Sequence, residues 1–273
     1  VQCALAWYTG AFADRERQLG VEILLDALLG TNQSPLKAAL LEEKLGADID
    51  VGFDDSTLQP VLELVLRGAT EETAEQFAPA VRRAVDGILA DVRARGDAAL
   101  KDYALKFDGA EIEELQVTQE EIDAAFAGMD PYFLETLRQA AANIEAFHRQ
   151  QVHKNFVMND KPGVVLGQKY TPIEKAGVYV PGGTAAYPST VLMDVIPAKV
   201  AGVSEIVMTT PAGKDGKVNP VILAAAATAG VTKIFKTGGA QAVAALAYGT
   251  ESIPAVDKIV GPGNIYVATA KRK

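Results

Sequence analysis

Short β-rich runs alternate with alanine-rich helical patterns between residues 164 and 273. The runs cover 177–180, 205–208, 233–236 and 257–260, and the helical patterns between them cover 188–201, 220–229 and 240–248. Because a strand–helix–strand repeat forces right-handed crossovers, this order predicts a parallel sheet. We therefore expect an α/β fold, a Rossmann-like parallel sheet with flanking helices. Pro197 is expected to kink or end the first crossover helix.

A helical segment precedes this layer. Apolar residues recur on one face of 81–95, as in an amphipathic helix. Thr118 and Glu121 have the spacing of a capping box, and Asp130 followed by Pro131 is typical of a helix N-terminus. The pattern therefore predicts helices over 81–95, 118–127 and 131–150.

The opening part has a different composition. Helical patterns over 14–29 and 34–45, followed by period-2 alternation over 58–67, predict an α+β piece. We predict three parts: this α+β piece over 1–85, a helical segment over 86–170 and an incomplete Rossmann-like domain over 171–273. The last of these ends in a helix that begins near Asn264.

Composition narrows the class of protein. The 273 residues carry a net charge of -9 and include one cysteine, Cys3. An acidic surface repels phosphate backbones, so we expect no nucleic-acid binding. No apolar run in the sequence is long enough to span a bilayer, so we expect no membrane binding and predict a cytoplasmic protein. His148 and His153 lie too far apart around a helix to share a metal ion, and we expect surface or packing roles for both.

Glycine-rich segments follow three of the predicted strands. Ligands bind beyond the carboxyl ends of parallel strands, where glycine permits close approach and helix N-termini favour phosphate oxygens. The three segments, around 181–190, 237–241 and 261–264, together predict a dinucleotide seat. The alternative is that glycine serves only tight strand-to-helix turns. No G-x-G-x-x-G or G-x-x-x-x-G-K-[ST] motif is present, and no acidic residue obviously binds a ribose.

Three segments resemble one enzyme family. They are GVYVPGGTAAYPS at 177–189, GGAQA at 238–242 and DKIVGPGNIYVA at 257–268, and they resemble histidinol dehydrogenase. The resemblance extends over about 86–273 and is incomplete at the C-terminus. It implies a zinc-dependent homodimeric oxidoreductase that converts L-histidinol through L-histidinal to L-histidine. In this reaction, the last step of histidine biosynthesis, two hydrides pass in turn to two NAD molecules.

The same resemblance implies three NAD contacts, from Tyr179, Gln241 and Asn264. A phenol can pack against a nucleotide, and both amides can donate and accept hydrogen bonds. Each residue also has a structural alternative: a strand aromatic for Tyr179, a first-turn helix residue for Gln241 and an N-cap for Asn264.

The family's zinc ligands and its catalytic Glu-His pair are expected in segments that would follow Lys273. We therefore assign no catalytic or metal-binding residue within the chain. A chain without them has neither metal-assisted nor base chemistry, so we expect it to be an inactive fragment.

The opening 85 residues resemble a different family. LLGTNQSPLKAAL at 28–40 weakly resembles an internal piece of the presequence-protease branch of insulinase-like zinc peptidases, although no H-x-x-E-H motif is present. We place the change of resemblance between Gly68 and Ile88, and interpret it as two joined incomplete genes or, less simply, a natural fusion. Two alternatives to a dehydrogenase therefore remain: a peptidase-related chain and a non-catalytic dimerisation module.

Overall fold

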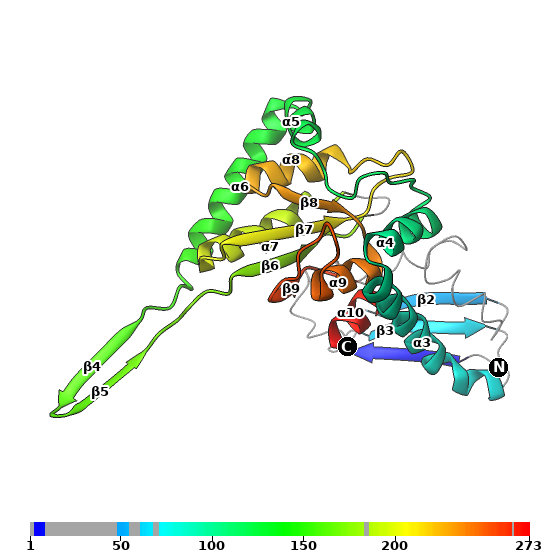
Figure 1. The fold of residues 1–273 in the computed structure, drawn as a ribbon, viewed down its shortest axis with the longest axis horizontal. Coiled ribbons are helices and arrows are strands. Elements are labelled where there is room, and N and C mark those ends of the chain that lie inside the picture. Colours follow the sequence, from blue (N-terminus) through cyan, green and yellow to red (C-terminus); the bar gives the residue numbers. More distant parts are fainter. Residues whose placement is uncertain (1–2, 9–47, 55–60, 68–70, 183–185, 264) are drawn as a thin grey trace.

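A computed structural model describes residues 3–8, 48–54, 61–67, 71–182, 186–263 and 265–273. Its centre is a four-stranded parallel sheet of β6 (Lys175–Tyr179), β7 (Glu205–Thr210), β8 (Lys233–Lys236) and β9 (Lys258–Val260), in the order β8-β7-β6-β9. Helices cover both of its faces (Figure 1). The predicted Rossmann-like α/β layer is therefore confirmed, with every predicted strand within two residues of its expected limits.

The strand order reverses once. The chain steps from β6 to β7 to β8 through α7 (Pro188–Ala201) and α8 (Pro220–Ala229). It then returns through α9 (Gly239–Tyr248) to place β9 on the free side of β6. The point between β6 and β9 is thus the topological switch point, where open α/β sheets bind ligands.

Two apolar clusters hold the layers together. On one face α7 and α8 pack with α5 (Gln119–Ala127) and α6 (Pro131–Arg149) over Val178, Met208 and Ile234. On the other face α9 packs with α3 (Glu71–Arg95), α4 (Asp97–Tyr103) and α10 (Ile265–Arg272) beneath Tyr179, Val207 and Phe235. Alternate side chains of each strand thus pack into opposite clusters, as expected for a sheet buried on both faces.

The helix boundaries agree with the local signals. The Thr118 hydroxyl accepts the Glu121 N–H at 3.2 Å, and the Glu121 carboxylate accepts the Thr118 N–H at 2.9 Å. Asp130 caps α6 by accepting the Phe133 N–H at 3.0 Å. These two helix starts are confirmed as predicted, because capping depends only on residues within one turn.

Two predictions near helices need correction. α7 is a single helix that includes Pro197, so the proline does not end it, and the alternative that it kinks the helix stays a prediction. The predicted helix over 81–95 is the end of a longer helix, α3, which starts at Glu71 and contains Pro79. α3 therefore crosses residue 85 without a break, although the division of the chain into three parts stays a prediction.

Strands outside the main sheet form two smaller sheets. β1 (Cys3–Tyr8), β3 (Val61–Arg67) and β2 (Asp48–Asp54) form an antiparallel sheet, in which β3 matches the strand expected around 58–67. β4 (Phe156–Lys161) and β5 (Val164–Gln168) form a hairpin that the pattern did not predict. The helices expected over 14–29 and 34–45 lie outside the described residues.

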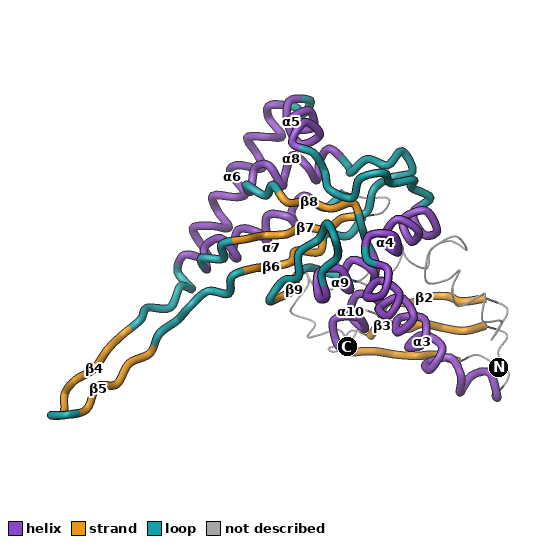
Figure 2. The backbone as a smooth tube through the Cα atoms, in the orientation of Figure 1, coloured by secondary structure: helices purple, strands orange, loops and turns teal. Residues whose placement is uncertain are grey.

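The hairpin projects far from the sheet, as Figures 1 and 2 show. All residues of both strands are exposed, including Val157 at 74% and Val165 at 73%. A two-stranded hairpin has little stability of its own in water. We name this segment, residues 156–168, the hairpin arm.

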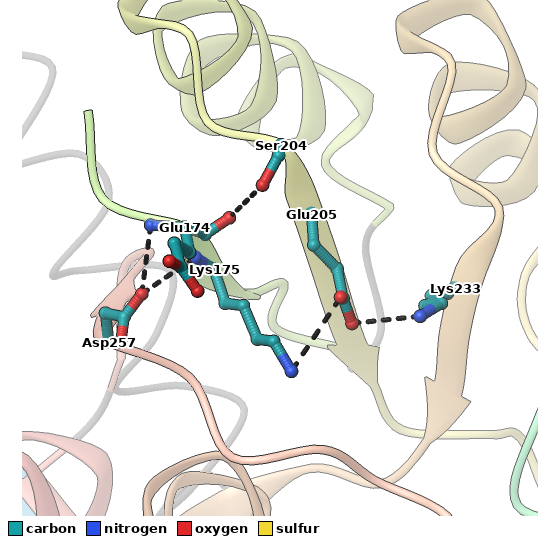
Figure 3. Close-up of polar contacts among 6 residues, drawn as sticks. All are labelled: Glu174, Lys175, Ser204, Glu205, Lys233 and Asp257. Atoms are coloured by element: carbon teal, nitrogen blue, oxygen red, sulfur yellow. Dashed lines mark hydrogen bonds and ion pairs between the residues drawn. The ribbon is translucent and has the colours of Figure 1, made fainter. Parts of the chain in front are cut away.

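Polar contacts fix the strands at the amino edge of the sheet (Figure 3). One oxygen of Asp257 accepts the backbone N–H groups of Glu174 at 3.1 Å and Lys175 at 2.8 Å, which joins the start of β9 to that of β6. Glu205 at the start of β7 pairs with Lys233 of β8 at 2.9 Å, and this contact holds the pKa of Glu205 below its ordinary value. These polar groups at the amino edge are therefore paired with one another.

Candidate functional site

Two of the glycine-rich turns at the carboxyl edge pack against the same proline. A Cβ on Gly182, after β6, or on Gly238, after β8, would collide with the ring of Pro211, which follows β7. Pro211 thus lies between the two turns and in van der Waals contact with each. The three consecutive strand ends therefore form one continuous surface, which we call the rim.

Tyr179 joins the rim to the start of α9. It ends β6 and is 4% exposed, and its hydroxyl accepts the Gly239 N–H at 3.1 Å. Burial raises the pKa of Tyr179 to about 12, the Gly239 N–H opposes this shift, and the nearby charge of Asp108 adds to it. The phenol is therefore neutral at physiological pH, and its hydroxyl proton remains available for donation.

Gln241 lies in the first turn of α9 and is 3% exposed. Its amide folds back toward Gly239, close enough to collide with a Cβ at that position. Tyr179 and Gln241 thus meet at the same turn, one through its hydroxyl and the other through its amide. Asn264 lies outside the described residues, so its contribution, like the cofactor contacts of the other two, stays a prediction.

The loop that follows β9 lies against Tyr179 at the switch point. Gly261 has φ +116°, and a Cβ there would overlap the backbone carbonyl of Tyr179. Lys271 of α10 donates a hydrogen bond to the Gly261 carbonyl at 2.8 Å. Burial lowers the pKa of Lys271, and Asp194 of α7 opposes that shift. The loop therefore contacts both β6 and α10, and we include it in the rim.

Three buried oxygens have no hydrogen-bond partner within the described part of the chain. Two lie at the rim, Thr209 Oγ1 at the end of β7 and Thr237 Oγ1 after β8, and the third is Asp194 Oδ2 on α7. Burial raises the pKa of Asp194 to about 6. Buried polar groups almost always have partners, so unpaired oxygens at a sheet's carboxyl edge are typical of a ligand site. The sequence analysis missed all three, because burial of a hydroxyl depends on tertiary packing.

The two histidines lie away from the rim. His148 Nδ1 lies 2.6 Å from Gln151 Oε1, and the ring of His153 stacks on Tyr170 at 4.6 Å. Among the residues the structure describes, no three His, Cys, Asp or Glu side chains form a group able to hold a metal ion. Within the same residues, no helix combines the length and apolar character needed to cross a membrane.

Fold and rim together define a class: α/β proteins with a ligand seat at the switch point of a parallel sheet. The family model for histidinol dehydrogenase matches residues 71–273. The chain belongs to the histidinol dehydrogenase family. The sequence analysis predicts that the resemblance changes from one family to the other between residues 68 and 88, and the family match begins within that interval. The match includes all of α3.

Curated relatives and a crystal structure agree with this assignment. The chain is 58% identical over 201 residues to histidinol dehydrogenase from Geobacillus kaustophilus, which covers 74% of this chain and 47% of that protein. It is 54% identical over 214 residues to the Chlorobaculum tepidum enzyme, covering 78% and 50%. The crystal structure of histidinol dehydrogenase from Elizabethkingia anophelis matches with a TM-score of 0.68 and 40% identity, covering 70% of this chain and 44% of that one. The chain thus spans about half the length of the curated relatives it matches.

Proposed function

We propose that this chain carries the nucleotide-binding half of a cytoplasmic, NAD-dependent histidinol dehydrogenase. The reaction is the oxidation of L-histidinol through L-histidinal to L-histidine, the last step of histidine biosynthesis. The observation that carries the proposal is the close packing of three glycine-rich turns at the carboxyl edge. Gly182 and Gly238 pack against Pro211, and Gly261 packs against Tyr179 at the switch point, where Gln241 lies at the turn that Tyr179 contacts. Family membership supports the reaction class, and the rim supports the cofactor.

The residues of the rim fit a dinucleotide. NAD, when bound, accepts the hydride that leaves the substrate carbon. The glycine turns admit phosphate or ribose close to the backbone, and the unpaired hydroxyls of Thr209 and Thr237 lie at the same edge. The amide of Gln241 supplies both donors and an acceptor. These groups bind and orient the cofactor, and the chemistry of hydride transfer belongs to the nicotinamide.

The described residues do not fit a zinc ion. A zinc site needs three or four nitrogen, oxygen or sulfur ligands in a tetrahedral arrangement. No such group exists among the residues that the structure describes. We therefore assign no step of the reaction to a metal held by these residues. Zinc dependence remains an implication of the family resemblance.

NAD should raise the thermal stability of the chain, because a ligand that binds only the folded state shifts the unfolding equilibrium. Gln241→Ala should weaken NAD binding by roughly 3- to 10-fold, the effect of losing about one hydrogen bond. Differential scanning fluorimetry with increasing NAD measures both. Gln139→Ala, on the exposed surface of α6, is the control and should bind as the wild type does. No stabilisation of the wild type at millimolar NAD would contradict the proposal.

We also propose that the chain pairs with a second copy through the hairpin arm. The arm exposes apolar side chains on both faces and has little to stabilise it alone. Val157 pairs with Gly167, so Val157 and Val165 share one face. Replacing both with lysine should shift the mass in sedimentation velocity from dimer to monomer and leave the circular dichroism spectrum unchanged. A monomeric wild type at micromolar concentration would argue against this pairing.

A further inference from the structure

One carboxyl group close to the rim, that of Asp108, has no hydrogen-bond or ion-pair partner among the residues that the structure describes. Asp108 ends the π-helical turn η1 (Ala104–Asp108) and precedes Gly109, which has a left-handed φ of +64°. The side chain is partly buried. No residue in the described part of the chain donates a hydrogen bond to the Asp108 carboxyl or forms an ion pair with it. An acidic group taken from water without compensation destabilises the fold, so its position calls for a functional explanation.

The segment that carries Asp108 lies over the carboxyl edge of the sheet. Its neighbours Ala104, Ala110 and Ile112 belong to the same apolar cluster as Tyr179. Further along, the Leu115 carbonyl accepts the Lys236 N–H at 2.7 Å, which attaches the segment to the end of β8. Figure 1 shows α4 and the turn after it beside the ends of β7 and β8. The segment that carries Asp108 therefore lies against the rim, although it comes from outside the strand–turn–helix units.

Two further observations connect Asp108 with the proposed nucleotide seat. Burial is the main cause of the raised pKa of Tyr179, and the charge of Asp108 adds to it. Thr209 pairs in register with Tyr179, so its unpaired hydroxyl lies on the same face of the sheet. The rim thus presents an uncompensated carboxyl, a phenol and an unpaired hydroxyl to one side. Such a set matches a ligand that carries neighbouring hydroxyl groups.

We propose that Asp108 accepts hydrogen bonds from the adenosine ribose hydroxyls of NAD and thereby selects NAD over NADP. This inference rests on the proposed function. A carboxylate accepts two hydrogen bonds from a vicinal diol, the role that an acidic residue has in many dinucleotide folds. The 2′-phosphate of NADP removes one of those donors and brings a like charge to the same place. The stem of Lys214 lies against Gly109, but within the described residues its ammonium forms no ion pair with Asp108.

The test measures the dissociation constants of NAD and NADP for the full chain by ligand-detected saturation-transfer NMR. The variant is Asp108→Asn, which keeps the size of the side chain and removes its charge. Asp160→Asn, in the exposed hairpin arm far from the rim, is the matched control. Asp108→Ser is a second variant, and circular dichroism checks that each protein is folded.

The wild type and Asp160→Asn should bind NAD at least about 10-fold more tightly than NADP, since hydrogen bonds to a charged group have effects of this size. In Asp108→Asn and Asp108→Ser, NAD binding should weaken, NADP binding should strengthen, and the preference should fall by about 10-fold. An unchanged preference in both variants, with NAD still bound, would overturn this inference alone. Failure of the wild type to bind either nucleotide would overturn the proposed function and this inference with it.

Discussion

Asp108→Asn should make the protein more stable at pH 8 by about 2 to 4 kcal/mol and leave its stability at pH 4 nearly unchanged. Burial raises the pKa of the Asp108 carboxyl from 3.8 to about 7. The folded chain therefore keeps a proton between about pH 4 and 7 that the unfolded chain releases. The free energy of unfolding falls as pH rises through that window, and the full penalty is present above pH 7. Asparagine never ionises, so the variant escapes this penalty.

Urea unfolding followed by circular dichroism at pH 4, 6 and 8 measures the effect. Asp194, with its pKa raised to about 6, titrates in the same window but is present in both proteins, so its contribution cancels in the difference. Asp160→Asn, at an exposed site, should change stability by less than about 0.5 kcal/mol at every pH. A difference between Asp108→Asn and wild type that does not depend on pH would show that the carboxyl is not held in an uncompensated environment.

A variant that is more stable at pH 8 and less selective between NAD and NADP would explain why the carboxyl is present. Functional sites commonly contain groups that reduce the stability of the fold. The paired acids at the amino edge, Glu205 and Asp257, have partners within the chain. Asp108, at the opposite edge, has none among the described residues. The difference between the two edges indicates that only one of them is built for a ligand.

Local signals made the layered fold predictable. The capping residues Thr118 and Asp130 interact within one turn, and glycine at the strand ends marks each passage from strand to helix. Strand–helix alternation then leaves few topologies open, because the crossovers are right-handed. A helix end could not be predicted from Pro197 alone, since α7 continues past it. The packing of α7 against α6 and α8 outweighs the free-energy cost of one proline inside the helix.

The rim was predictable only in part. The glycine turns follow strands in the sequence, so the rule for parallel sheets located them, whereas Tyr179 and Gln241 came from the family resemblance. Asp108 comes from the preceding helical segment, and only tertiary packing brings it to the same edge. The hairpin arm escaped prediction because strands exposed on both faces have no buried alternation to reveal them.

Gly261→Ala should abolish NAD binding and destabilise the fold by about 3 kcal/mol or more, a large loss for a single added methyl group. The φ of +116° is strained for any residue with a Cβ. The added methyl group would also overlap the Tyr179 carbonyl, so the loop after β9 must move away from β6. That movement breaks the contact at the switch point and displaces Lys271 from the Gly261 carbonyl.

Gly87→Ala is the matched control, because Gly87 is exposed on α3 and a Cβ there has no neighbour within 4 Å. Alanine favours helices, so this variant should be stabilised by up to about 1 kcal/mol and bind NAD normally. Urea unfolding gives both stabilities, and NAD titration by NMR gives both affinities. The two substitutions add the same methyl group, so a difference between them reports the environment of Gly261. Wild-type NAD affinity in Gly261→Ala would place the cofactor away from the loop between β9 and α10, and the rim would then not be the seat of the nucleotide.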